Sequence, residues 1–236
     1  MDRAARGDLA VLERAATFDR PVTLAGEQTV PVLDALVPLL PDTGLRRGQV
    51  VALVGPAATS LAFALAAGPS AAGAWVGAVG LPGLGLVAAA EAGVALERLV
   101  LVAAPDPAVW ATVAATLVDA MDVVLLAPPR SARLGDVRRL QARVRERGAV
   151  VVHLGPAGAF EPDLTLTATS VLWHGLQRGA GHLRARQVTV TASGRRAAAR
   201  PRSAVLWLPD EDGHIRLHEA AAPVVALPVV ALRTTG

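Results

Sequence analysis

The chain has 236 residues, 53% hydrophobic and 18% charged, a balance that excludes a disordered chain and is ample for a buried core. It contains no cysteine and no lysine, which excludes disulfides, thiolate metal sites, Schiff-base catalysis and a Walker-type phosphate lysine. Its formal net charge is only +3 and aromatic residues make up 3%, so composition gives little support to nucleic-acid binding.

The N-terminal part shows a helical pattern and no targeting signal. Residues 9–18 and 30–40 are predicted as helices, so residues 1–40 form an N-terminal helical segment. Residues 48–90 carry no charge, but glycine–proline pairs divide them into pieces too short to span a membrane, which takes about 20 apolar residues. We therefore expect a cytoplasmic protein without a membrane partner.

From residue 49 onward, short apolar runs alternate with alanine-rich helical stretches. The predicted strands are residues 49–54, 74–79, 99–102, 122–126 and 149–154. The predicted helices are residues 57–67, 84–92, 108–120 and 135–147. Uniformly apolar strands that alternate with helices are typical of parallel strands covered on both faces. The sequence therefore predicts a doubly wound α/β fold with a mainly parallel sheet, within a core of residues 41–208.

After Pro162 the pattern changes to alternating, β-branched runs separated by glycine-containing turns. Residues 165–176, 183–192 and 203–208 are predicted as antiparallel strands that extend the same sheet. Residues 209–236 are assigned to a C-terminal tail.

The turn after the first core strand is where a phosphate-binding loop would lie. A hydrophobic strand ends there in Gly55-Pro56, and Thr59-Ser60 opens the next helix. The motif needs a final Gly-Lys-[Ser/Thr], and this chain has neither the lysine nor a second glycine before the helix. Either two residues are deleted before Thr59, or Ser60 and Leu61 replace the Gly-Lys pair.

Several segments resemble RecA-type recombinases in their order and spacing. Residues 44–56 resemble the approach to the phosphate loop, 74–79 the next strand, 91–99 the following helix exit and strand, and 122–126 the Walker B strand. The resemblance extends from about Leu33 to Leu208 and implies a RecA-like fold. It places the catalytic glutamate at Val79 and the Walker B aspartate at Ala127. It therefore implies a pseudoenzyme without a cofactor, with shortened DNA-binding loops at residues 128–134 and 156–163.

Degenerate RecA-like chains of this length resemble the ImuA group. That resemblance implies an accessory factor in DNA-damage-induced mutagenesis, within the SOS response and translesion synthesis. Its partners would be an ImuB-like, inactive Y-family polymerase homologue and, through it, an error-prone replicative-type polymerase and the sliding clamp. Two other hypotheses remain open: a nucleotide-dependent ATPase with an unorthodox phosphate loop, and a DNA-binding module that uses arginine clusters.

Two arginine clusters have alternative interpretations. On the helix predicted at residues 135–147, apolar residues form one stripe and arginines lie elsewhere, which describes either a surface helix or a phosphate or acidic-partner patch. A loop between two predicted strands has no acid of its own, so it is either a solvated hairpin or a contact for DNA or an acidic protein. Its arginines are Arg195, Arg196, Arg200 and Arg202.

Two further features are considered as functional sites: a pair of histidines and the C-terminal tail. His214 and His218 lie near several acids, but the Asp212-Gly213 turn indicates a hairpin, and we expect no metal site. The tail repeats Pro-Val-Val-Ala-Leu and is either packed on its own domain or docked on another protein. The resemblance favours docking to ImuB through the repeat positions Pro223, Val225, Leu227, Pro228, Val230 and Leu232.

Overall fold

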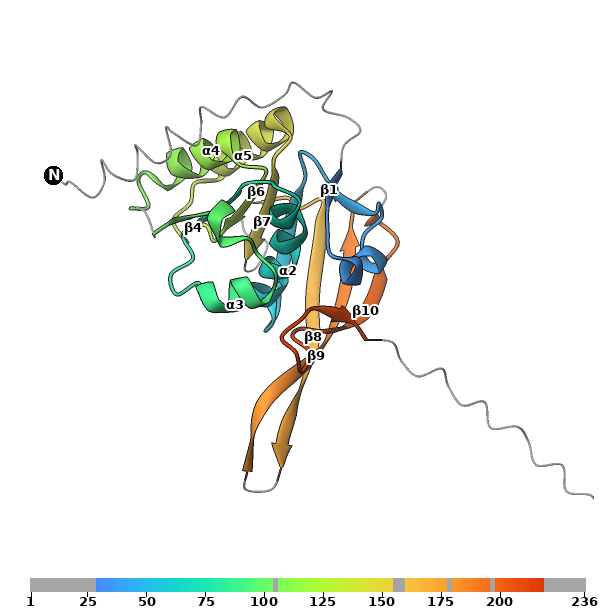
Figure 1. Cartoon of the computed structure of the whole chain (residues 1–236). Helices are drawn as coiled ribbons and strands as arrows, with labels where there is room; N and C mark the ends of the chain where they lie inside the picture. The colour runs from blue at the N-terminus through green and yellow to red at the C-terminus, as the bar shows by residue number, and fades with distance from the viewer. Residues whose placement is uncertain (1–28, 104–105, 155–159, 178–179, 196–197, 219–236) are drawn as a thin grey trace, which may run out of the picture.

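The computed structural model describes residues 29–103, 106–154, 160–177, 180–195 and 198–218 (Figure 1). Within them a 9-stranded sheet has the order β11-β10-β9-β8-β3-β7-β6-β4-β5. Neighbouring strands from β8 to β5 are parallel, whereas β9, β10 and β11 are added in antiparallel fashion. This confirms the predicted α/β fold with a mainly parallel sheet and an antiparallel C-terminal extension. The helix predicted at residues 9–18 lies outside the described residues.

The parallel strands fall inside their predicted ranges. They are β3 (Val50–Val54), β4 (Val76–Val79), β5 (Leu99–Val102), β6 (Val123–Leu126) and β7 (Val150–Leu154). Every residue of β4 and β6 is buried, as expected for strands with helices on both faces. The apolar runs of β3, β4, β6 and β7 therefore lie in the core, whereas β5, at the end of the sheet, is only partly buried.

Helices cover both faces of this parallel half. They are α2 (Ala58–Ala71), α3 (Leu86–Glu91), α4 (Trp110–Ala120) and α5 (Leu134–Arg147). One core cluster joins α2 to one face of β3, and a second joins α4 and α5 to the opposite face. Helix α2 continues beyond its predicted end at residue 67, because Pro69 lies in the last turn and interrupts only that turn.

The single helix predicted at residues 30–40 is wrong. Thr29–Pro31 forms strand β1, which pairs antiparallel with an unpredicted strand, β2 (Gly44–Arg46). Only Asp34–Leu39 is helical, as the 3-10 helix η1. Prolines at positions 31 and 38 prevent a continuous α-helix. Leu36 and Leu39 are fully buried in the core cluster of α2, so η1 packs on the sheet.

The antiparallel half contains two long strands. They are β8 (Leu164–Gln177) and β9 (Ala180–Gly194), followed by β10 (Arg202–Trp207) and an unpredicted short strand, β11 (Arg216–Leu217). Strand β8 pairs with β3 only from Leu164 to Thr167 and then runs on past the end of β3. With β9 it forms a two-stranded ribbon that projects from the body (Figure 1). None of the described helices is long and apolar enough to cross a membrane.

Candidate functional site

The degenerate phosphate-loop position lies where β3 passes into α2. Only Gly55, Pro56 and Ala57 join the two elements, and the Ala58 amide donates to the Gly55 carbonyl at 3.2 Å in a tight turn. Gly55 has φ +101°, and a Cβ atom there would lie 2.2 Å from the Ala168 carbonyl oxygen on β8. A phosphate loop needs a longer segment whose amides wrap around the phosphates. This connection is too short to form that cradle.

An arginine from β9 reaches the first turn of α2. The Arg186 guanidinium donates from Nη2 to Ser60 Oγ at 2.6 Å and from Nε to the Leu208 carbonyl at 2.7 Å. Its Cζ lies 5.0 Å from the centre of the Trp173 ring. Burial lowers the pKa of Arg186 from its ordinary value. This half-buried side chain therefore connects the antiparallel half to the phosphate-loop position.

The other two positions implied by the resemblance meet at the same edge of the sheet. Val79 ends β4 and is fully buried, and the Ala127 amide, just after β6, donates to its carbonyl at 3.2 Å. A Cβ atom on Gly80 would lie 2.6 Å from the Ala127 carbonyl and 3.9 Å from Nε1 of the buried Trp110. The fold brings these positions together, but their side chains offer neither a carboxylate nor a proton acceptor.

His153 is buried, although the sequence pattern assigned it no role. It lies on β7, beside Ala52 of β3 and Leu126 of β6, with its ring stacked on Phe160 at 5.2 Å. The side chain is fully buried, and within the described residues neither ring nitrogen has a hydrogen-bond partner. Burial lowers the pKa of His153 to about 4. The imidazole is therefore neutral at physiological pH.

The arginine loop lies at the opposite edge of the sheet, after β9. The loop has no acid of its own, but Glu161, which precedes β8, pairs with Arg195 at 3.0 Å, so Arg195 is not an unpaired charge. The Arg195 amide also donates to the Asp163 carbonyl at 3.0 Å. Arg200 is exposed and Arg202 half-exposed, and Arg196 lies outside the described residues.

Arg195 shares a pocket of about 250 Å³ with arginines that are distant in sequence. These are Arg46, Arg47 and Arg145. Arg46 pairs with Asp42 at 3.2 Å and Arg47 with Asp122 at 3.1 Å. Most of the positive charge in this pocket is thus compensated, and Arg145, Arg200 and Arg202 remain without a side-chain partner in the part of the chain that the structure describes.

Helix α5 has a buried apolar stripe and arginines outside it, as the interpretation as a surface helix predicts. Val137, Leu140 and Val144 are buried, as the stripe predicted. Arg143 and Arg147 both bind Asp119 on α4, at 2.5 and 3.0 Å, and the contact with Asp119 raises the pKa of Arg143. These arginines hold α4 and α5 together.

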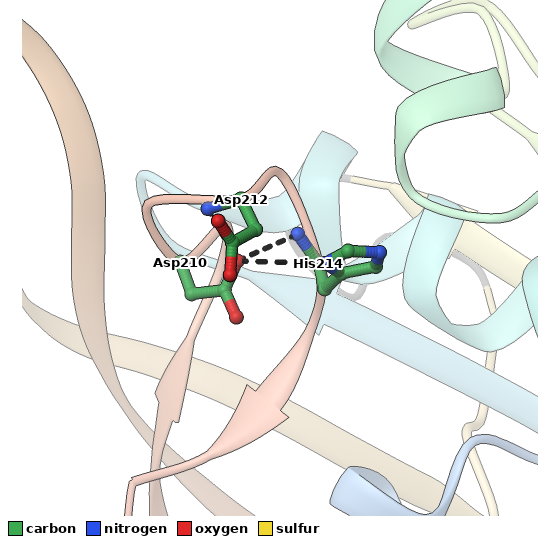
Figure 2. A group of neighbouring side chains, drawn as sticks. All are labelled: Asp210, Asp212 and His214. Carbon is green, nitrogen blue, oxygen red and sulfur yellow. Dashed lines mark hydrogen bonds and ion pairs between the residues drawn. The ribbon is translucent and has the colours of Figure 1, made fainter.

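Of the two histidines considered as metal ligands, only His214 lies beside acidic side chains among the described residues. Asp210, Asp212 and His214 lie in the loop between β10 and β11, with ligand atoms within 4.8 Å of one another (Figure 2). The Asp210 carboxylate already accepts hydrogen bonds from the backbone amides of Asp212 and His214 and pairs with Nε of Arg216. His218, the other predicted residue, instead lies 3.4 Å from Gln187 and contacts the Trp207 ring. The group stabilises a turn.

The fold and the site define an α/β protein with a strand–turn–helix at the place of a phosphate loop, but without lysine or carboxylate there. The chain belongs to the MT3502 N-terminal domain family, which residues 38–159, more than half of the 236, match. An uncharacterized Mycobacterium tuberculosis protein, Rv3395c, is 39% identical over 142 residues. The aligned part spans 60% of this chain and only 60% of that relative's length. The antiparallel half lies outside the family match.

Proposed function

We propose that this chain is a non-catalytic accessory protein of DNA-damage-induced mutagenesis that binds an ImuB-type, polymerase-like partner in the cytoplasm. Through that partner it would reach an error-prone polymerase and the sliding clamp. The closed phosphate-loop position is the observation that carries the non-catalytic part of this proposal. The partner and the pathway rest on the resemblance of the sequence to the ImuA group.

The closure has three physical components. Three residues join β3 to α2, the Ala168 carbonyl lies against Gly55, and Arg186 is bonded to Ser60. A nucleotide would have to separate these contacts, and it would then meet no lysine to neutralise its phosphates. Phosphoryl transfer depends on positioning and charge neutralisation, and both are missing at this position.

Capture of the purified ImuB-type protein of the same organism tests the proposed function. The full chain should bind it without added nucleotide. Failure of the unaltered chain to bind would overturn the proposed partner.

A variant lacking residues 223–236, which lie outside the described residues, tests the tail. If the tail docks, the truncated chain keeps its melting temperature and loses capture. If the tail packs on its own domain, truncation lowers the melting temperature. A stable truncated chain that still captures the partner would exclude tail docking while leaving the accessory role intact.

A second candidate function is DNA binding at the amino edge of the parallel strands. Arg145, Arg200 and Arg202 have no side-chain partner among the described residues, which supports a contact with phosphates. Each phosphate contact on duplex DNA contributes about −0.9 to the log–log salt slope. Removing the three arginines should therefore reduce the slope by up to about 2.7 if all of them bind phosphate. An unchanged slope would exclude this site.

A further inference from the structure

The ribbon formed by β8 and β9 is an unusual feature of this fold. We call residues 172–177 and 180–187 the arm. The neighbouring strands do not extend along the arm. Strand β3 pairs with β8 only to Thr167, and β10 pairs with β9 only from Gln187 onward. Beyond the pair His174–Ala185 the two strands pair only with each other. The arm therefore stands away from the body, past the carboxyl ends of the parallel strands (Figure 1).

The base of the arm is anchored. Arg186 stacks on Trp173 and reaches α2 and the Leu208 carbonyl. On β8, the His174 ring contacts the Trp207 ring of β10 at 5.0 Å. These contacts orient the arm relative to the sheet. A pre-oriented element loses less conformational entropy when it binds.

The surface of the arm is apolar. Leu172, Leu176 and Leu183 are 55%, 65% and 50% exposed, and Trp173 is 45% exposed. A two-stranded ribbon is only marginally stable alone in water, and clustered exposed apolar side chains mark interaction sites in soluble proteins. The leucines offer a partner apolar contact area and no group that binds phosphate.

The two strands that carry these leucines have charged residues of one sign only. The chain contains no Asp or Glu between Asp163 and Asp210. The arginines of this stretch are Arg178, Arg184, Arg186, Arg195, Arg196, Arg200 and Arg202. Arg184 is exposed and has no side-chain partner among the residues that the structure describes. Charge complementarity therefore favours a partner with carboxylates.

We propose that the arm docks into an apolar groove of a partner protein whose rim carries carboxylates. The leucines fill the groove, and Arg184 meets the acidic rim. A protein fits better than DNA, because three leucines and a tryptophan are exposed on the arm. The inference rests on the proposed function to the extent that the ImuB-type protein is the partner tested.

Calorimetric titration of the full chain with the purified ImuB-type protein tests the arm. Replacing Leu172, Leu176 and Leu183 together by serine should weaken binding by about tenfold or more, as expected for central apolar contacts. A matched triple variant replaces Leu101, Val109 and Leu134, which are 43%, 48% and 48% exposed elsewhere, and should change binding less than about twofold. Arg184→Glu should weaken binding and reduce its dependence on salt.

A variant with a shortened arm keeps the test valid if the triple serine variant does not fold. An Asn-Gly turn in place of residues 175–184 joins His174 to Ala185 as a two-residue hairpin and keeps the base contacts. It should retain the melting temperature and lose partner binding.

The outcomes separate the two proposals. If the unaltered chain fails to bind, the proposed function and the arm inference both fall. If both arm variants bind as the unaltered chain does, only the arm inference is overturned. If the arm variants lose binding to a 30-base-pair DNA duplex but still bind the partner protein, the arm docks on DNA and the arm inference is overturned.

Discussion

The parallel and antiparallel halves of the sheet differ in how far their side chains are buried. In the parallel half, β4 and β6 are buried throughout, and helices cover both faces. In the antiparallel half, β9 passes from an exposed run at the arm to an alternating pattern beside β10. The strands of the parallel half are closed in by helices, whereas the arm exposes leucines that none of the described helices covers.

Strand β9 also separates two candidate surfaces. Its 15 residues run from the arm to the arginine loop, a length of about 50 Å at roughly 3.3 Å per residue. The arm is mainly apolar, whereas the loop presents Arg200 and Arg202 beside Arg195, which is already paired. One molecule therefore offers two chemically distinct contacts that can be removed separately.

The two halves meet where Gly55 faces Ala168. Gly55→Ala should lower the free energy of unfolding by about 3 kcal/mol, because it adds the strain of a positive φ to a collision with a backbone oxygen. The matched control is Gly73→Ala, where φ is +94° and the new Cβ meets nothing within 4 Å. It should lose only about 1–2 kcal/mol. Equal losses in urea denaturation would show that the Gly55 contact does not hold the halves together.

The buried His153 should make the stability of the parallel half depend on pH. The unfolded chain takes up a proton near the ordinary histidine pKa of 6.5, whereas the folded chain does so only at about 4. Stability should thus be complete above about pH 6.5 and fall by about 3 kcal/mol as the pH drops to 4. His153→Leu should flatten this dependence in urea denaturation between pH 4 and 7. An unaltered pH profile would mean that another group titrates.

Arg186 connects the halves by hydrogen bonds. Arg186→Met keeps the apolar stem and removes the bonds to Ser60 and Leu208, so unfolding should become easier by about 1–2 kcal/mol. Ser60→Ala removes one acceptor and should lose about half as much. Thermal denaturation of both variants measures the difference. No loss in Arg186→Met would indicate that burying the charge offsets its bonds.

The smallest effect on stability is expected in the arginine loop. Replacing Arg195, Arg196, Arg200 and Arg202 together by alanine should change the free energy of unfolding by less than about 0.5 kcal/mol, because the described members are at least partly exposed. The same variant should weaken contact with DNA or with an acidic protein, measured by electrophoretic shift and partner capture. Unchanged behaviour in both assays would identify the loop as a solvated hairpin.

Local pattern predicted the strands well and the contacts between distant segments poorly. The apolar runs predicted β3, β4, β6 and β7 because burial on both faces leaves few other choices of residue, and the edge strand β5 kept the same apolar pattern while only partly buried. Prolines, which were visible in the sequence, excluded a continuous helix at residues 30–40. The Arg186–Ser60 bond spans 126 positions and depends on the register of β8 and β9, which the sequence does not specify. A histidine after three valines was a visible signal for His153.

The phosphate-loop position is closed to nucleotide, and a binding measurement shows whether it stays closed. Calorimetric titration of the full chain with ATP and magnesium should show no binding tighter than millimolar. The physical reasons are the three-residue connection, the bond between Arg186 and Ser60, and the missing lysine. Micromolar affinity would mean that this position opens to nucleotide and would favour an ATPase with an unorthodox loop.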